Sequence, residues 1–542
     1  MKVYLLHRDR DLEIEPDLRD PIFDAMRSGH LYAIANAKRE MERQQRITSR
    51  PPAPGKYDAL IADLELATLW NGMAAGDEFI YDTAKRVVLS SLTDPDEIRY
   101  RQQVLADCIE HTEVVSELYA VAIDALASER KVTSFWSGAM PDWILRRSVQ
   151  LLELFLDILR RLRLIAEDHG QSFRSEGFRR FFEMVSEELA DDYLQTVEHQ
   201  LRELELRRGV LQSADLGKGD KGRGYIFHQP PPDATWRQRL LPGKQPGSYS
   251  FELHPRDEAG FRALAEIKGR SLNSVADAVA QSADHVQSFF VTLRLELAFY
   301  LGCVNLHRRL HAKGEPTCFP EPTSARQLAL NARDVYDVCL SLHLDDVVVG
   351  NEVNADRRSL LMITGANQGG KSTLLRSLGV AQLMMQSGMF VGAQAFRASI
   401  CAGIFTHYKR EEDAGMEGGK LDEELRRMSE IVDLIKPDSI LLCNESFAST
   451  NEREGSEIAR RVVRAMLHRQ IRVLFVTHMY DLAHSFHAQQ LDNALFLRAE
   501  RNPDGRRTFK LLEAEPLRTS YGEDSYRRIF HVEEPGAIAS RS

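Results

Sequence analysis

Apolar residues in the first three-fifths of the chain recur at the spacing of an α-helix. The clearest stripe consists of Leu152, Phe155, Leu159, Leu162 and Ile165. Separations of three or four residues place all of these side chains on one face of a helix. Residues 176–208 add dense charge between the apolar positions, as expected of a long exposed helix. Residues 56–324 are therefore predicted to form a mostly α-helical scaffold.

The pattern changes after residue 325, where short apolar runs alternate with amphipathic stretches. Strands are predicted at 359–363, 439–443 and 473–477, and this alternation indicates an α/β domain over residues 325–542. Proline-rich linkers at 46–55 and 314–322 mark the boundaries. Residues 1–55 form a short N-terminal segment, with a helix expected over 22–43.

A phosphate-binding loop follows the first of these strands. It has the spacing G-x-x-x-x-G-K-S and consists of Gly365, Ala366, Asn367, Gln368, Gly369, Gly370, Lys371, Ser372 and Thr373. Glycines let backbone N–H groups surround phosphate oxygens, Lys371 supplies a positive charge, and the Ser372 hydroxyl suits Mg²⁺. The helix N-terminus that follows also favours anions. We therefore predict binding of ATP with Mg²⁺.

The next two strands end in polar side chains. Residues 439–443 lead to Asn444 and Glu445, and residues 473–477 lead to His478. P-loop ATPases have an Asp that holds Mg²⁺ in this region, beside a residue that orients the attacking water. Asn444 keeps an oxygen but not the charge. We predict Glu445 and His478 as catalytic and Ser372, Asn444 and Glu445 as the metal site, although a lone histidine is more often structural.

Two further segments are candidates for binding. Gly418 and Gly419 open a predicted helix, and the N-terminus of a helix can bind an anion. Because the first loop already holds one nucleotide, this second anion site suggests that the nucleotide of a partner subunit binds here, in a dimer. An ordinary loop glycine pair is the alternative.

Residues 215–247 are predicted to form a loop with six basic and three acidic residues, interleaved with aromatic residues. Such a loop could contact a phosphate backbone, or it could be a solvated loop. The candidate DNA-binding residues are Lys218, Lys221, Arg223, Arg237 and Arg239.

Composition narrows the class of protein. The 542 residues exceed what one core accommodates, and the net charge of −10 argues against a dedicated nucleic-acid binder. No apolar run approaches the ~18 residues that a membrane span needs, and the N-terminus becomes charged too early for a signal peptide. Six scattered cysteines without a C-x-x-C pair indicate a reduced, cytoplasmic protein.

Together these motifs resemble those of the MutS DNA mismatch-repair ATPases. The family's TGPNMGGKST loop corresponds to 364–373, its FTR…DD segment to 405–413, and its DE…T…DG strand and loop to 444–455. Val476-Thr477-His478 is similar to the family's ATH segment, and Ser520-Tyr521-Gly522 to its SYG segment. These blocks keep the family's order over about 200 residues. Upstream, Arg101-Gln102 resembles an R-Q pair of the family's core segment.

The resemblance implies an ABC-type ATPase domain behind a helical core, lever and clamp. It implies a homodimer that embraces DNA, with Gly418, Gly419 and Thr450 acting across the dimer. Several positions depart from the family: Asn444 replaces its Asp, Gly419 stands where it has a serine, and no mismatch-reading domain is expected. The formal match to its Phe-x-Glu reader, residues 181–183, falls inside a helix, and no dimerisation tail or nuclease domain is expected after residue 522.

We therefore predict a cytoplasmic, MutS-like ATPase of DNA repair or recombination that binds double-stranded or branched DNA rather than mismatches. The alternative is a nucleotide-gated scaffold dimer that acts on a protein or RNA assembly with slow hydrolysis. Acidic net charge and Asn444 favour the scaffold, whereas the basic loop and the family motifs favour DNA. The ATPase subunit of a transporter would leave the helical half unexplained.

Overall fold

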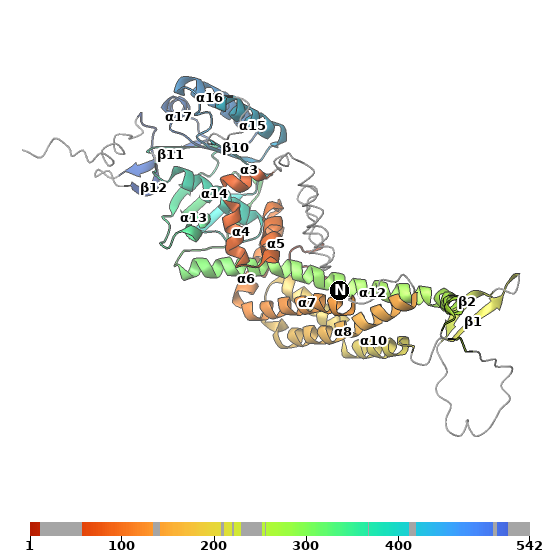
Figure 1. Ribbon diagram of the computed structural model, residues 1–542. Coiled ribbons are helices and arrows are strands. Elements are labelled where there is room, and N and C mark those ends of the chain that lie inside the picture. Colours follow the sequence, from red (N-terminus) through yellow and green to blue (C-terminus); the bar gives the residue numbers. More distant parts are fainter. Residues whose placement is uncertain are drawn as a thin grey trace, which may run out of the picture.

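A computed structural model describes residues 1–10, 57–133, 141–206, 211–218, 222–228, 252–254, 256–366, 368–410, 419–501 and 507–518. The helix expected over 22–43, the linker at 46–55, and the motif residues 412–413 and 520–522 lie outside this part of the chain. Figure 1 shows sheets at one end of the molecule and a long helical arm that ends in a small hairpin at the other.

The first half of the chain is helical, as predicted. Its helices are α3 (Asp58–Asp63), α4 (Leu66–Ala74), α5 (Glu78–Leu89), α6 (Pro95–Glu110), α7 (Thr112–Thr133), α8 (Pro141–His169), α9 (Glu176–Glu188), α10 (Asp191–Leu204) and α12 (Glu258–Ala312), with a 3-10 turn at Gly170–Ser172. Local chemistry sets several boundaries. Asp77 caps α5, Asp94 precedes the proline that begins α6, and Ser175 caps α9.

The 55-residue helix α12 runs the length of the arm and packs against α7 and α8 (Figure 1). Phe289, Phe290, Leu293 and Leu297 form its buried stripe. Contrary to the prediction from the sequence, the segment Leu272–Ala312 contains an 18-residue window with a mean hydropathy of 1.5, apolar enough to span a bilayer. Because 78% of that window is buried inside the molecule, α12 is a core helix here.

Two predictions about the arm were wrong. The helix expected over 176–208 is divided into α9 and α10, and the chain turns between them at Leu189 and Ala190. The stretch expected to be a loop contains strands β1 (Leu211–Leu216) and β2 (Gly222–His228), which form an antiparallel hairpin. Five of the six residues of β1 are exposed, so the strand shows no alternation between buried and solvent-facing positions. Residues 181–183 lie within α9, as expected, with Phe181 and Phe182 buried.

The second half of the chain is built on two sheets. The larger has the strand order β12-β11-β6-β10-β9-β8, and the smaller has the order β3-β7-β4-β5. The larger sheet consists of β6 (Leu360–Thr364), β8 (Ile404–Tyr408), β9 (Ile440–Asn444), β10 (Arg472–Val476), β11 (Ala494–Arg501) and β12 (Arg507–Glu513). The smaller consists of β3 (Glu321–Thr323), β4 (Leu330–Val335), β5 (Asn351–Asn354) and β7 (Ala395–Ser399). The helices of this half are α13 (Val338–His343), α14 (Lys371–Gln386), α15 (Lys420–Leu434), α16 (Glu452–His468) and α17 (Tyr480–His487), with a 3-10 turn at Ala325–Gln327.

Within the larger sheet, strands β6, β8, β9, β10 and β11 are parallel to one another, and β12 pairs antiparallel with β11. Parallel strands buried on both faces read as continuous apolar runs, as those of β6, β9 and β10 do. Their carboxyl ends meet at one edge of the sheet, so the three segments expected to bind nucleotide converge there.

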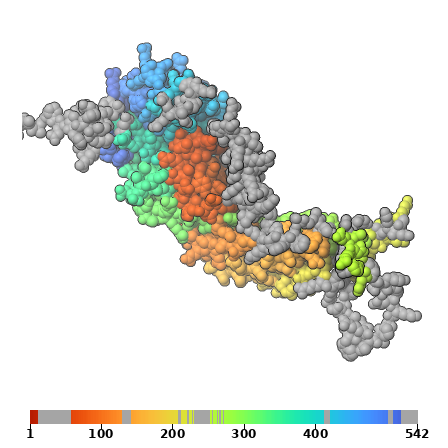
Figure 2. All heavy atoms as spheres, viewed as in Figure 1, coloured from red at the N-terminus to blue at the C-terminus, as the bar shows by residue number. Residues whose placement is uncertain are grey.

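The two halves form one continuous core. Figure 2 shows the early helices α3–α5, in red and orange, seated directly against the sheet half. Helix α4 contacts α13, α5 contacts α14, and α3 contacts β8. One apolar cluster accordingly runs from Leu64 and Trp70 to Leu375 and Leu383.

Residues 1–10 pack against helices of the helical half beside this junction. Glu296 of α12 accepts hydrogen bonds from the backbone N–H groups of Leu5 and Leu6, at 2.8 and 3.0 Å. The Tyr300 hydroxyl donates to the Leu5 carbonyl, and Arg101 donates to that of Leu6. The first residues of the chain are thus fixed by buried side chains of the helical half.

The Arg101-Gln102 pair has a structural place in this junction. Both side chains are buried, and Gln102 donates to the Pro320 carbonyl. Arg101 donates to the carbonyl of Ser387, the residue that ends α14. The pair therefore connects α6 to the sheet half.

Candidate nucleotide-binding site

The loop between β6 and α14 has a conformation that requires glycine at two positions. Gly365 has φ +112° and Gly370 has φ +87°. A Cβ at Gly365 would lie 2.8 Å from the backbone nitrogen of Ala499, and one at Gly370 would lie 3.1 Å from the carbonyl oxygen of Phe509. Strands β11 and β12 therefore press on the loop and exclude side chains there. Asn367, the loop's central residue, lies outside the described residues.

Lys371 begins α14 directly after this loop. Its ammonium group donates to the carbonyl oxygens of Gly365 and Ala366, at 3.0 and 2.9 Å. Burial lowers the pKa of Lys371, while the nearby carboxylate of Glu445 opposes that shift. A buried cation enclosed by the loop suits recognition of an anionic phosphate.

Ser372 lies one residue further and faces the end of β9. Its hydroxyl donates to Oδ1 of Asn444 at 3.0 Å. A hydroxyl, an amide oxygen and the adjacent Glu445 carboxylate are hard oxygen donors of the kind that Mg²⁺ prefers. Among the residues that the structure describes, no group of three or more His, Cys, Asp or Glu side chains could hold a metal ion by itself. Such a Mg²⁺ would therefore need ligands from nucleotide phosphates and water.

Glu445 and His478 come from adjacent parallel strands and meet at the same edge. His478 Nδ1 lies 3.2 Å from Glu445 Oε2. The hydrogen bond to His478 lowers the pKa of Glu445, against the effect of its partial burial. The carboxylate is consequently ionised at neutral pH and able to accept a hydrogen bond from water.

The remaining residues predicted to act across a dimer lie on other segments. Gly419 is the residue before α15, Gly418 is outside the described part, and Thr450 donates to Glu454 at the start of α16. Asn451 caps α16 by accepting from the Glu454 N–H at 3.0 Å. Thr450 therefore belongs to a well-capped helix start.

The candidate DNA-binding residues are divided between described and undescribed positions. Lys218 and Arg223 are exposed on or beside the β1–β2 hairpin at the far end of the arm (Figure 1). Arg223 lies opposite Asp215 in the register of the hairpin. Lys221, Arg237 and Arg239 lie outside the described residues.

Sequence reasoning missed a buried histidine beside Glu445. His407 on β8 contacts the Ser446 hydroxyl through Nδ1 at 2.7 Å and the Glu424 carbonyl through Nε2 at 2.9 Å. These partners are 39 and 17 residues away along the chain. The pairing of β8 with β9 brings His407 to Ser446, and the packing of α15 against β8 brings it to Glu424, so no local signal could have revealed the contacts.

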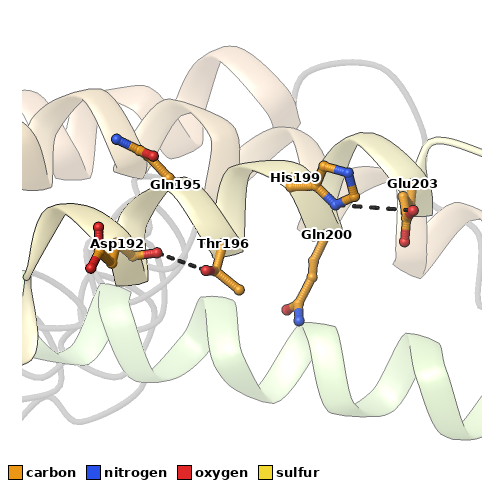
Figure 3. Close-up of a pocket in the computed structure, with 6 residues that line it drawn as sticks. All are labelled: Asp192, Gln195, Thr196, His199, Gln200 and Glu203. Carbon is orange, nitrogen blue, oxygen red and sulfur yellow. Dashed lines mark hydrogen bonds and ion pairs between the residues drawn. The ribbon is translucent and has the colours of Figure 1, made fainter.

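A separate hollow lies beside α10 on the arm, away from the nucleotide-binding loop. It has a volume of about 570 Å³ and is lined by Asp192, Gln195, Thr196, His199, Gln200 and Glu203 (Figure 3). Thr196 bonds back to the carbonyl of Asp192 within the same helix. With two acidic residues in its lining, this hollow does not suit a phosphate, and we assign it no role in nucleotide binding.

Comparisons with known proteins agree with this geometry. Residues 93–313 match the MutS2 N-terminal domain, and residues 361–529 match MutS domain V. The chain is 29% identical over 153 residues to an endonuclease MutS2 of Thermus thermophilus, covering 27% of this chain and 20% of the relative. It is 31% identical over 137 residues to MutS protein homolog 4 of Mus musculus, covering 25% of this chain and 14% of the relative. It is 28% identical over 180 residues to a DNA mismatch repair protein MutS of Porphyromonas gingivalis, covering 30% and 20%. The matched part thus spans about a fifth or less of the length of these relatives.

Proposed function

We propose that this chain, which belongs to the MutS family, is an ATPase that uses nucleotide binding to control a clamp-like grip on DNA. The proposal rests foremost on one observation. The loop at 365–370, Lys371, the Ser372–Asn444 pair and the Glu445–His478 pair all lie at one edge of a parallel sheet. Phosphate recognition, metal binding and activation of water need this set of groups in one place.

Each group then has a role in ATP hydrolysis. The loop and Lys371 would hold the phosphates, and Ser372 and Asn444 would hold Mg²⁺, which would supply positive charge against the phosphates. Glu445 orients the attacking water through its ionised carboxylate. His478 holds that carboxylate and contacts the γ-phosphate. Asn444 provides an oxygen without the negative charge of the family's Asp, so turnover is slow.

The DNA-binding part of the proposal comes from the family and the arm. The named relatives include an endonuclease and a mismatch repair protein. The arm presents exposed Lys218 and Arg223 at its far end. We propose an ABC-type head that dimerises with a second copy, with Gly418, Gly419 and Thr450 facing the partner's nucleotide. The two arms then enclose double-stranded or branched DNA whose shape, rather than a mismatch, is recognised.

The charge of the site and of the chain favours a second candidate function. The neutral Asn444 at the metal site and the net charge of −10 suit a nucleotide-gated scaffold that grips a protein or RNA assembly. DNA binding distinguishes the two functions, because a grip on phosphates weakens steeply with salt.

The direct test of the nucleotide site compares variants in ATP binding and hydrolysis. Lys371→Ala should weaken ATP binding by roughly a hundredfold or more, since the phosphates lose their buried cation. Glu445→Gln should leave binding nearly unchanged and lower turnover by roughly a hundredfold. Lys436→Ala is the control, because Lys436 is exposed near the amino end of β9, at the opposite edge of the sheet. Unchanged ATP affinity in Lys371→Ala would refute the site.

A further inference from the structure

The turn that carries Glu445 has an unusual backbone. Glu445 has φ +55° and Phe447 has φ +63°, and both residues have side chains. Residues other than glycine avoid this left-handed region, so a turn with two of them persists only where surrounding contacts hold it.

One fixed point is the sheet itself. The Glu445 N–H donates to the Val476 carbonyl at 2.9 Å, which continues the β9–β10 ladder by one residue. This bond sets the start of the turn but leaves Ser446 and Phe447 to other partners.

His407 supplies those partners. Its ring is fully buried and stacks on the buried ring of Phe447, with centroids 5.3 Å apart and planes 26° apart. The Ser446 hydroxyl lies between two acceptors on the same residue, His407 Nδ1 at 2.7 Å and the His407 carbonyl at 2.6 Å. His407 therefore contacts both residues that follow Glu445.

The other ring nitrogen connects this turn to α15. Nε2 lies 2.9 Å from the Glu424 carbonyl, and because a carbonyl only accepts, Nε2 carries a hydrogen. Burial lowers the pKa of His407 to about 4, so the ring is neutral and Nδ1 carries no hydrogen. The Ser446 hydroxyl, which donates to the His407 carbonyl, therefore shares its one hydrogen between that carbonyl and Nδ1. A second link, from the Ser449 hydroxyl to Glu424 Oε1 at 2.9 Å, joins α15 to the same loop without contacting the ring.

We propose that His407 is a positioning residue for ATP hydrolysis, which holds the Glu445 turn in its left-handed conformation and links it to α15. This inference rests on the proposed function, in which Glu445 orients water and α15 begins at the segment facing the partner's nucleotide. A displacement of α15 reaches the turn that aims the carboxylate through the His407 ring, beside the link from Glu424 to Ser449. Occupancy of one site then influences the chemistry of the other.

The test compares kcat with ATP affinity in purified full-length variants. His407→Phe keeps the ring stack on Phe447 and the Ser446 bond to the backbone carbonyl of residue 407, but it loses both polar links of the ring. We expect kcat to fall roughly tenfold or more while the Kd for ATP changes by less than about twofold. Ser446→Ala should behave alike, because it removes the bond between ring and turn. His407→Asn retains a polar group near the Nδ1 position and should restore most of kcat. Ser449→Ala, which removes only the second link, is the matched control and should keep kcat.

The outcomes separate this inference from the function on which it rests. If the wild-type protein hydrolyses no ATP, the proposed function fails. If the wild type is active and Ser446→Ala keeps its full kcat, the positioning role of His407 is refuted. The same conclusion follows if His407→Phe and Ser449→Ala lose kcat equally. Should His407→Phe not fold, Ser446→Ala and His407→Asn decide the matter.

Discussion

Asn444 lies between Ser372 and Glu445, the two other side chains proposed to bind Mg²⁺. Its Oδ1 accepts from Ser372, and Glu445 follows it directly. The amide oxygen preserves the hydrogen bond that an Asp would make, but it adds no charge. Weak metal affinity, rather than a misplaced ligand, is therefore the expected consequence.

Asn444→Asp is predicted to raise Mg²⁺-dependent turnover by roughly three- to tenfold. The reason is that a carboxylate of the same shape adds a negative charge beside the cation. Turnover measured across Mg²⁺ concentration should also show half-saturation at lower metal. The control is Asn493→Asp, near the start of β11. Gln382→Glu is not an equivalent substitution, because Gln382 is a buried amide on α14 that bonds to Gln386 and lies outside the site. A fall in turnover of Asn444→Asp would mean that the neutral amide is required.

His7 makes stability depend on pH. Arg101 donates to its Nε2, which must then be unprotonated, and Nδ1 lies 3.3 Å from Glu97. Burial, reinforced by Arg101, lowers the pKa of His7 from 6.5 to about 3. The unfolded chain therefore takes up a proton as the pH falls below 6.5 while the folded chain does not, and folding weakens by up to about 1.4 kcal/mol per pH unit from this residue.

We therefore expect the free energy of unfolding, measured with urea at pH 7.5 and pH 5, to fall less between these values in His7→Gln than in wild type. His199→Gln, at an exposed position on α10, is the control and should keep the wild-type dependence. An unchanged dependence in His7→Gln would contradict the structural account of His7.

At the residue scale, sequence spacing predicted the loop, Lys371, Ser372, Asn444, Glu445 and His478, and the structure brings them to one edge. Spacing could single out these residues because a motif at one strand end is local. Spacing could not find His407 and His7, because the contacts that define their roles are made with residues far along the chain. His407 contacts Ser446, and His7 contacts Arg101.

At the element scale, α14 connects the nucleotide site to the helical half along its whole length. Its Arg376 pairs with Asp337 and with Glu65, between α3 and α4. At its carboxyl end, Gln386 bonds to the Leu92 carbonyl and Ser387 accepts from Arg101. Movement of this helix on nucleotide binding would therefore reach α3–α6 directly.

Gly388→Ala is predicted to weaken this connection. Gly388 has φ +77°, and a Cβ there would clash with the Cβ of Arg101. We expect a loss of about 2 kcal/mol or more in the free energy of unfolding, from strain and overpacking together. Gly76→Ala is the matched control: Gly76 has φ +96° but nothing within 4 Å of its added Cβ, so only the strain remains. Equal losses in the two variants would show that the contact with Arg101 is unimportant.

Element types followed from periodicity where the apolar stripe was strong, as in α8, α12, β6 and β10. The hairpin of β1 and β2 was missed because five of the six residues of β1 are exposed and offer no alternation between buried and solvent-facing positions. The break between α9 and α10 was missed because Leu189, a good helix former, turns the chain there by packing into the core. Tertiary packing, not local propensity, decided the second case.

At the scale of the whole molecule, the single helix α12 extends from the sheet half to the hairpin (Figure 1). Its Glu296 and Tyr300 hold the first residues of the chain, which Arg101 joins to the end of α14. A continuous packed path therefore connects the nucleotide site to the arm. Closure of the heads around ATP would shift the population of arm positions through this path.

The hairpin residues are predicted to contribute to DNA affinity through charge. A combined Lys218→Ala and Arg223→Ala variant should bind DNA more weakly at low salt and show a smaller slope of log affinity against log salt, by about one to two, because two phosphate contacts are lost. Arg174→Ala, an exposed arginine elsewhere on the arm, is the control. An unchanged slope would exclude the described part of the hairpin from the DNA contact.

The measurement that tests the account most directly is binding of the purified protein to linear, mismatched and branched DNA, with and without ATP, across salt. We predict salt-sensitive binding that favours branched DNA and responds to ATP, with the response abolished in Lys371→Ala. Failure to bind any of the three DNAs at low salt would contradict the DNA clamp and leave the nucleotide-gated scaffold as the function to pursue.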